Sequence, residues 1–123
     1  MTSIDPAASY VASVLTFYLE MPDTPMRVSA SDQWLARHFH QDGVPLETVE
    51  TALLLGSLRR MIRPPDAQRL APIRSLAYFR PVIEELQENP APENYRDYLR
   101  LKLRTATQTP PTKVQKTTFS NDR

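Results

Sequence analysis

The stretch Val44–Ile62, "VPLETVETALLLGSLRRMI", is the longest segment of the chain with a helical pattern. Its middle, Ala52–Leu55, is apolar on nearly every side of a helix, which is typical of a central, buried helix. Gly56 costs this helix about 1 kcal/mol of propensity relative to alanine. A closely packed neighbouring helix would explain the glycine. We therefore expect this segment to form the centre of the fold.

The two segments before it also carry helix signals. Asp5 as an N-cap and Pro6 at the first helical position predict a helix over residues 6–21. Ser29 and Asp32 resemble a capping box and predict the start of a second helix. The apolar side of this second helix is expected to consist of Trp34, Leu35, His38 and Phe39.

Helical spacing resumes after the central segment, but Pro81 interrupts it. A proline inside a helix removes a backbone hydrogen bond and clashes with the preceding turn, at a cost of about 3 kcal/mol. We expect a short turn of helix up to Phe79, then a kink, and then a helix that starts near Pro81.

The segment "YRDYLRLKLRTAT" at residues 95–107 can be read as a strand or as a helix. As a strand, its leucines and its cations lie on opposite faces; as a helix, Arg96, Arg100 and Arg104 form one stripe. Pro92, followed by an acidic residue, is a helix-start signal, and no partner strand is visible. We favour the helix.

These patterns predict an all-α fold, a small bundle of about five helices. We expect a single domain over residues 1–104 and a flexible, disordered basic tail over residues 105–123, which is polar and without periodicity. The chain has no cysteine, no apolar run near the roughly 20 residues that span a bilayer, and no signal-peptide pattern. We expect a cytoplasmic protein that does not contact membranes.

The net charge is only +1, but the charges are segregated along the chain. Residues 1–58 carry a net −5, residues 59–80 +5, residues 81–95 −4, and residues 96–121 +5. Such blocks can build a positive face on a nearly neutral protein. Chance combined with solvated helix faces would give the same pattern. The first alternative predicts an anionic partner.

The cations of the two basic segments are the candidates for contact with phosphate. Arginine outnumbers lysine among them, and its forked donors suit phosphate. Those that end the central helix can also stabilise its dipole. Tyr95 and Tyr98 lie beside the stripe and could stack on bases or pack in the core. The predicted nucleic-acid-binding residues are Arg59, Arg60, Arg63, Arg69, Arg74, Arg96, Arg100, Lys102, Arg104, Lys113 and Lys116.

The segment "WLARHFHQDGVPLETVETALLL" at residues 34–55 has the order of a helix-turn-helix motif. However, its second helix begins with Glu47 and Glu50 and has no cation there, which is unfavourable for a recognition helix that approaches phosphates. We favour an αα-hairpin packed in the core.

Residues suited to catalysis or metal binding are few. His38 and His40 would project about 200° apart on a helix and cannot hold one metal ion together; we expect His38 to be partly buried and His40 exposed. Glu84, Glu85 and Glu88 fit a solvated helix face. No nucleophile is accompanied by a base and an orienting group. We expect no enzyme activity, no cofactor and no metal.

From about residue 34 to residue 86, the order of elements resembles the DnaD-like domains of bacterial, phage and plasmid replication-initiation proteins. The similarity rests on a short helix, "DGVPLETVETALLLG", a connector and "IRSLAYFRPVIEEL". "SLAYF" followed by "YRDYLRLKLR" is also similar to small proteins encoded near bacterial mobile elements. The resemblance implies a DnaD-like or helix-turn-helix-like bundle, DNA binding, and assembly with replication or transposition proteins, including homo-oligomers.

We therefore expect nucleic acid, and DNA above all, as the partner, bound by neutralisation of phosphates with release of counterions. The alternative is a protein-interaction adaptor whose segregated acidic and basic faces meet an acidic partner or a second copy of the chain. A small catalytic subunit is a third alternative, and no group of residues argues for it.

Overall fold

The computed structural model describes residues 5–108, and every regular element in this range is helical, which confirms the all-α prediction. The elements are α1 (Pro6–Glu20), α2 (Ala30–Gln41), α3 (Leu46–Met61), a 3-10 turn η1 (Leu76–Phe79), α4 (Arg80–Glu88) and α5 (Tyr95–Gln108).

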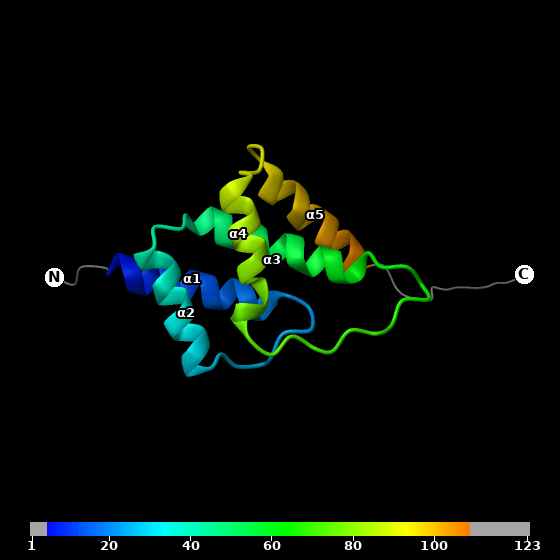
Figure 1. Ribbon diagram of the computed structural model, residues 1–123, viewed down its shortest axis with the longest axis horizontal. Helices are drawn as coiled ribbons and strands as arrows, with labels where there is room; N and C mark the ends of the chain where they lie inside the picture. The colour runs from blue at the N-terminus through cyan, green and yellow to red at the C-terminus, as the bar shows by residue number, and fades with distance from the viewer. Residues whose placement is uncertain (1–4, 109–123) are drawn as a thin grey trace, which may run out of the picture.

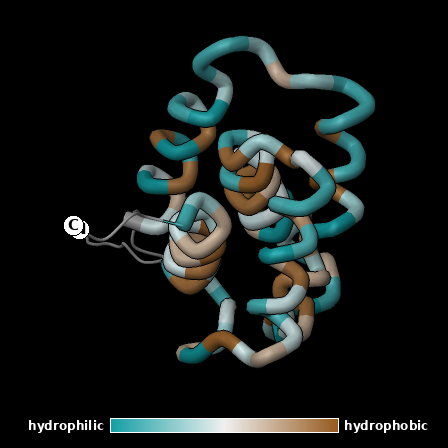
Figure 2. Tube along the Cα trace, turned by 90° about the vertical axis from the view of Figure 1, so that its left-hand side faces the viewer, coloured by the Kyte–Doolittle hydropathy of each residue, from teal (hydrophilic) through white to brown (hydrophobic). Residues whose placement is uncertain are grey.

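Helix α3 is the centre of the bundle, as predicted. Helices α1, α4 and α5 all pack against it, whereas α2 packs against α1 and η1 (Figure 1). Figure 2 shows that the hydrophobic positions of the helices turn mainly toward neighbouring helices. The buried side chains of α3 include Val49, Ala52, Leu53, Leu54 and Leu58.

Gly56 lies where another segment approaches α3 closely. A Cβ atom at this position would lie 2.8 Å from Cδ1 of Phe79, which is closer than carbon atoms pack. Phe79 is fully buried at the end of η1, with its ring edge-on to Tyr18. The predicted close neighbour of Gly56 is therefore confirmed, and it is the segment that joins η1 to α4.

The type of helix changes just before Pro81, and a new α-helix starts near this proline, as expected from the sequence. The 3-10 turn η1 ends at Phe79, and α4 begins at Arg80, so that Pro81 lies in the first turn of α4. Proline has no backbone N–H. In the first turn of a helix this loses no hydrogen bond, because the N–H groups there have no intrahelical partner in any residue.

Asp32 joins two segments in addition to capping its own helix. Its Oδ2 accepts a hydrogen bond from the backbone N–H of Ser29 at 3.0 Å, which completes the predicted capping box. Its Oδ1 accepts from the backbone N–H of Leu76 at 2.9 Å and ties η1 to α2. The carboxylate is buried, and both its oxygens have partners.

Three expectations about helix surfaces are wrong. Helices α2 and α3 do not form a packed αα-hairpin, because each packs mainly against other elements. Trp34 is 57% exposed rather than part of the apolar side of α2. His40 is half-buried, edge-on to the ring of Tyr10, because α1 packs along this side of α2.

The last helix differs from its prediction at both ends. It begins at Tyr95 rather than at Pro92, after Asn94 in the left-handed conformation (φ 71°). It continues to Gln108, so the first residues of the predicted tail are helical. The rest of that tail, with Lys113 and Lys116, lies outside the described residues.

Candidate anion-binding surface

The described cations fall into two groups, according to what their side chains contact. We call Arg59, Arg60 and Arg96 the held arginines, because each binds a carboxylate on another element. Arg59 donates two hydrogen bonds to Glu85 of α4, at 2.9 and 2.6 Å. This bidentate bond lowers the pKa of Glu85 and raises that of Arg59.

Arg96 joins α5 to α3. Its Nη1 donates to Oε1 of Glu50 at 2.6 Å, and this hydrogen bond raises the pKa of Arg96. The Glu50 side chain is only 12% exposed, so the pair is partly shielded from water. Arg96 is therefore engaged in holding the last helix to the central one.

Arg60 has the most buried side chain of the three, at 7% exposure. It donates to the hydroxyl of Tyr78 at 3.2 Å, to Oδ2 of Asp23 at 3.3 Å and to the carbonyl oxygen of Ala71 at 2.8 Å. Burial lowers the pKa of Arg60, but the hydrogen bonds to Tyr78 and Asp23 outweigh it and raise the pKa overall. Arg60 thus stays charged and fastens the segment after α3 to the bundle.

The other predicted cations in the described part of the chain are exposed and make no ion pair there. Arg63 donates to the carbonyl oxygen of Gln68. Arg100 lies over the ring of Phe17, with 5.1 Å from its Cζ to the ring centroid. The members of this group are Arg63, Arg69, Arg74, Arg100, Lys102 and Arg104.

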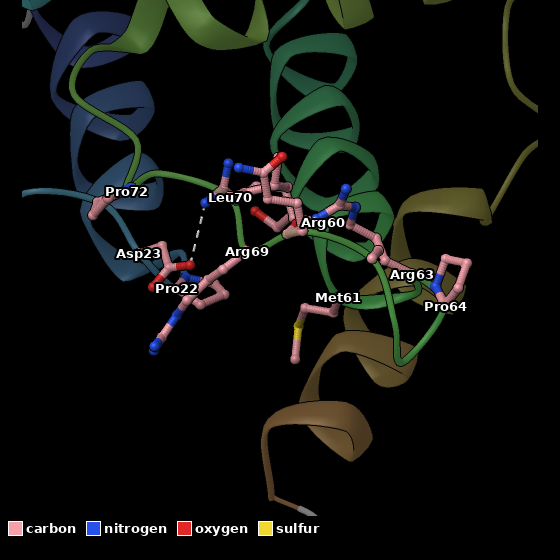
Figure 3. A pocket seen from close by; sticks show the side chains of 12 residues that line it. Pro22, Asp23, Arg60, Met61, Arg63, Pro64, Arg69, Leu70 and Pro72 are labelled. Atoms are coloured by element: carbon pink, nitrogen blue, oxygen red, sulfur yellow. Dashed lines mark hydrogen bonds and ion pairs between the residues drawn. The ribbon is translucent and has the colours of Figure 1, made fainter.

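Two adjoining depressions bring four of these cations to one end of the molecule. The first, the connector pocket, has a volume of about 510 Å³ and lies between α3 and the connector, residues 62–75. Arg63 and Arg69 line it (Figure 3). The second, of about 250 Å³, is lined by Arg100 and Arg104 of α5.

Pro22, after the end of α1, lines both depressions, so they adjoin each other there. Figure 1 shows why they meet: the C-terminal ends of α3 and α5 lie side by side, next to the start of the connector. We call Arg63, Arg69, Arg100 and Arg104 the basic end. Arg59, Arg74, Arg96 and Lys102 line neither depression.

The basic end carries more positive than negative groups. Glu20 and Asp23 are the carboxylates that line its two depressions, and Asp23 already binds Arg60. None of the four arginines lies in the last turn of α3 or α5, so stabilisation of the helix dipoles does not account for their positions.

The two tyrosines of α5 differ in how far they are exposed. Tyr95 is half-buried against the core, whereas Tyr98 is 54% exposed. Their rings are stacked, with 6.1 Å between centroids. Lys102 Nζ lies 5.9 Å from the centroid of Tyr98. Tyr98 is thus an exposed aromatic side chain beside a cation.

The sequence interpretation missed the connector pocket. Only the length of the connector, which has no helical periodicity, could have indicated it, because long segments without regular structure inside a compact domain are commonly functional. Asp23, in the left-handed conformation (φ 65°), aims its carboxylate at Arg60, which is 37 residues away in the chain. No local pattern encodes such a pairing.

No protein-family model, curated protein or solved structure matches this chain. Within residues 5–108, no helix is long and apolar enough to cross a membrane. The same range holds no group of three or more histidine, aspartate or glutamate side chains arranged to bind a metal ion.

Proposed function

We propose that the protein binds nucleic acid, with DNA as the expected form, through the basic end. The observation that carries the proposal is the gathering of four exposed arginines around two adjoining depressions, without an ion pair to any of them among the described residues.

An exposed guanidinium without a carboxylate partner can bind a phosphate without first breaking an ion pair. Charge-assisted bonds from arginine to phosphate are strong, and each neutralised phosphate releases counterions. The held arginines would have to give up Glu85, Asp23 or Glu50. We therefore leave them out of the proposed interface, although their positions in the sequence suggest the same function.

The test compares two double charge reversals that change the net charge equally. Arg100→Glu with Arg104→Glu alters the basic end. Arg37→Glu with Arg80→Glu is the control, since both are exposed, make no ion pair among the described residues and line neither depression. Fluorescence anisotropy with labelled duplex DNA, single-stranded DNA and RNA at two salt concentrations gives the affinities.

We expect the basic-end variant to bind at least about tenfold more weakly than the control variant. Wild-type affinity should fall about a hundredfold between 50 and 200 mM salt if four phosphates are neutralised. Equal losses in both variants would show that only the net charge matters. Absence of wild-type binding at low salt would overturn the proposal.

We further propose that this binding serves bacterial replication, plasmid or mobile-element biology, together with replication or transposition proteins. The support is the resemblance of the helix order to DnaD-like domains.

A second candidate function is a protein-interaction adaptor that self-associates through acidic and basic faces. Its support is α4, on which Glu84 and Glu88 are exposed and make no ion pair with a described residue. The basic end of a second copy could meet this acidic face. Light scattering over a range of protein and salt concentrations tests it: a dimer that dissociates at high salt supports self-association, and a monomer throughout contradicts it.

A further inference from the structure

The connector pocket has the size of a small-molecule site. Its volume of about 510 Å³ lies within the usual range of ligand pockets, roughly 300–1,000 Å³. One wall is the last turns of α3, and the other is the connector, which crosses in front of them (Figure 3).

The lining of the pocket combines positive charge with apolar surface. The lining holds three arginines, Arg60, Arg63 and Arg69, and one carboxylate, that of Asp23, which binds Arg60. A purely ionic site would not need apolar walls, and a purely apolar site would not hold three arginines. The pocket therefore fits an organic anion. The apolar lining consists of Pro22, Met61, Pro64, Ala67, Leu70 and Pro72.

Two buried polar groups in the lining have no hydrogen-bond partner among the described residues. They are Oγ of Ser57 and Nε of Arg60, which lie one turn apart on the same face of α3. An unpaired buried donor costs about 1–3 kcal/mol. A phosphate oxygen that enters the pocket as the connector opens could accept from both while Arg60 keeps its other bonds, and binding would then remove this cost.

The connector is held by few bonds, so the pocket can open without disturbing the core. Arg60 binds the carbonyl oxygen of Ala71, and the backbone N–H of Ile73 donates to the carbonyl oxygen of Asp23 at 2.9 Å. Between these anchors and α3 the connector has no helix or strand, and residues 62–66 are exposed. Such segments open at low free-energy cost.

We propose that the connector pocket binds a phosphate monoester with a flat apolar body, in the form of a nucleotide. The arginines bind the terminal phosphate, which carries nearly two negative charges and three acceptor oxygens. The base lies between the prolines and Leu70. This nucleotide site goes beyond the proposed function, because a free nucleotide would bind without a strand. The terminal nucleotide of a strand would present the same phosphate and base to the pocket.

Isothermal titration calorimetry with the full chain tests the chemistry of the ligand. The probes are AMP, adenosine, which lacks the phosphate, and inorganic phosphate, which lacks the apolar body. We expect AMP to bind at least about tenfold more tightly than either. No binding of AMP at millimolar concentration, or phosphate binding as tight as that of AMP, would overturn the proposal.

A pair of variants locates the site. Arg63→Gln with Arg69→Gln is expected to weaken AMP binding at least about tenfold. The control is Arg74→Gln with Arg80→Gln, which removes the same charge from exposed arginines outside the pocket and should leave the affinity unchanged. Equal losses in both variants would place AMP elsewhere and overturn the assignment.

Two further experiments are needed. The first distinguishes a free nucleotide from the end of a strand as the ligand, and the second distinguishes nucleotide binding in the pocket from strand binding at the basic end. Single strands with a 5′-phosphate and with a 5′-hydroxyl are compared; a preference for the phosphorylated strand assigns the pocket to strand ends, and equal affinity assigns it to free nucleotides. The variant with Arg100→Glu and Arg104→Glu should retain AMP binding while losing strand binding. Loss of AMP binding in that variant would contradict a separate pocket.

Discussion

The held arginines and the basic end are alike in sequence and different in structure. Arg60 and Arg63 are three residues apart at the end of one helical segment, and Arg96 and Arg100 are one turn apart on another. Yet Arg60 and Arg96 are fastened to carboxylates on other elements, whereas Arg63 and Arg100 face the two depressions. A count of cations along the chain therefore mixes arginines that hold elements together with arginines that we propose bind an anion, and only their contacts in the folded chain distinguish them.

The strongest test of this contrast is Arg60→Ala. We expect the free energy of unfolding to fall by about 2–3 kcal/mol, because the nearly buried Arg60 side chain makes three hydrogen bonds, to Tyr78, Asp23 and Ala71, and all three are lost. This loss is smaller than for a fully buried ion pair, because the Asp23 side chain is 64% exposed. Urea denaturation measures the change.

The matched control for that experiment is Arg69→Ala, in the same pocket but exposed. It should change the free energy of unfolding by less than about 0.5 kcal/mol. If both variants lose the same stability, the distinction between held and exposed arginines is wrong at this end of the molecule.

A smaller effect is expected at Arg96. Replacing it with alanine leaves the carboxylate of Glu50, which is 12% exposed, without its partner. We expect a loss of about 1–2 kcal/mol in the free energy of unfolding, below the value for a fully buried pair, because Arg96 itself is partly exposed.

Glu50→Gln in the Arg96→Ala background separates the charge effect from the packing effect. It removes the unpaired charge and should restore part of the lost stability in the same denaturation experiment. Failure to restore any would mean that Arg96 acts through packing of its aliphatic part alone.

The smallest effect belongs to Arg59→Ala, since both partners of the Arg59–Glu85 pair are exposed. Surface pairs of this kind contribute little. Because Arg59 lowers the pKa of Glu85, any stabilisation is present above the ordinary pKa of 4.5 and is lost as the pH falls below it. Thermal melts at pH 7 and pH 3 should show a difference between variant and wild type only at pH 7. The nucleic-acid affinity of Arg59→Ala should equal that of the wild type. A weaker affinity would show that Arg59 belongs to the proposed interface.

Local signals predicted the helices well. Asp5, the Ser29–Asp32 box and Pro81 each mark a helix start where the structure has one. These signals depend on neighbours within a turn, so no tertiary information is needed. Gly56 also indicated a close neighbour, although only the structure shows that it is Phe79.

The candidate site was predictable only in part. The basic segments at residues 59–74 and 96–104 were visible, and the structure joins parts of both at Pro22. The pocket itself was not visible, and neither was the exposure of Trp34, since an apolar pattern does not show which of its members the neighbouring helix covers.

The sequence by itself determined the all-α class, the helix starts and the central position of α3, because periodicity and capping act over a few residues. Only the tertiary structure decided which arginines are available. The carboxylates that occupy Arg59, Arg60 and Arg96 are 26, 37 and 46 residues away in the chain, and each is brought into reach by packing of separate elements. Charge pairing at that distance is a consequence of the fold, so the proposed binding surface consists of the arginines that the fold leaves unpaired.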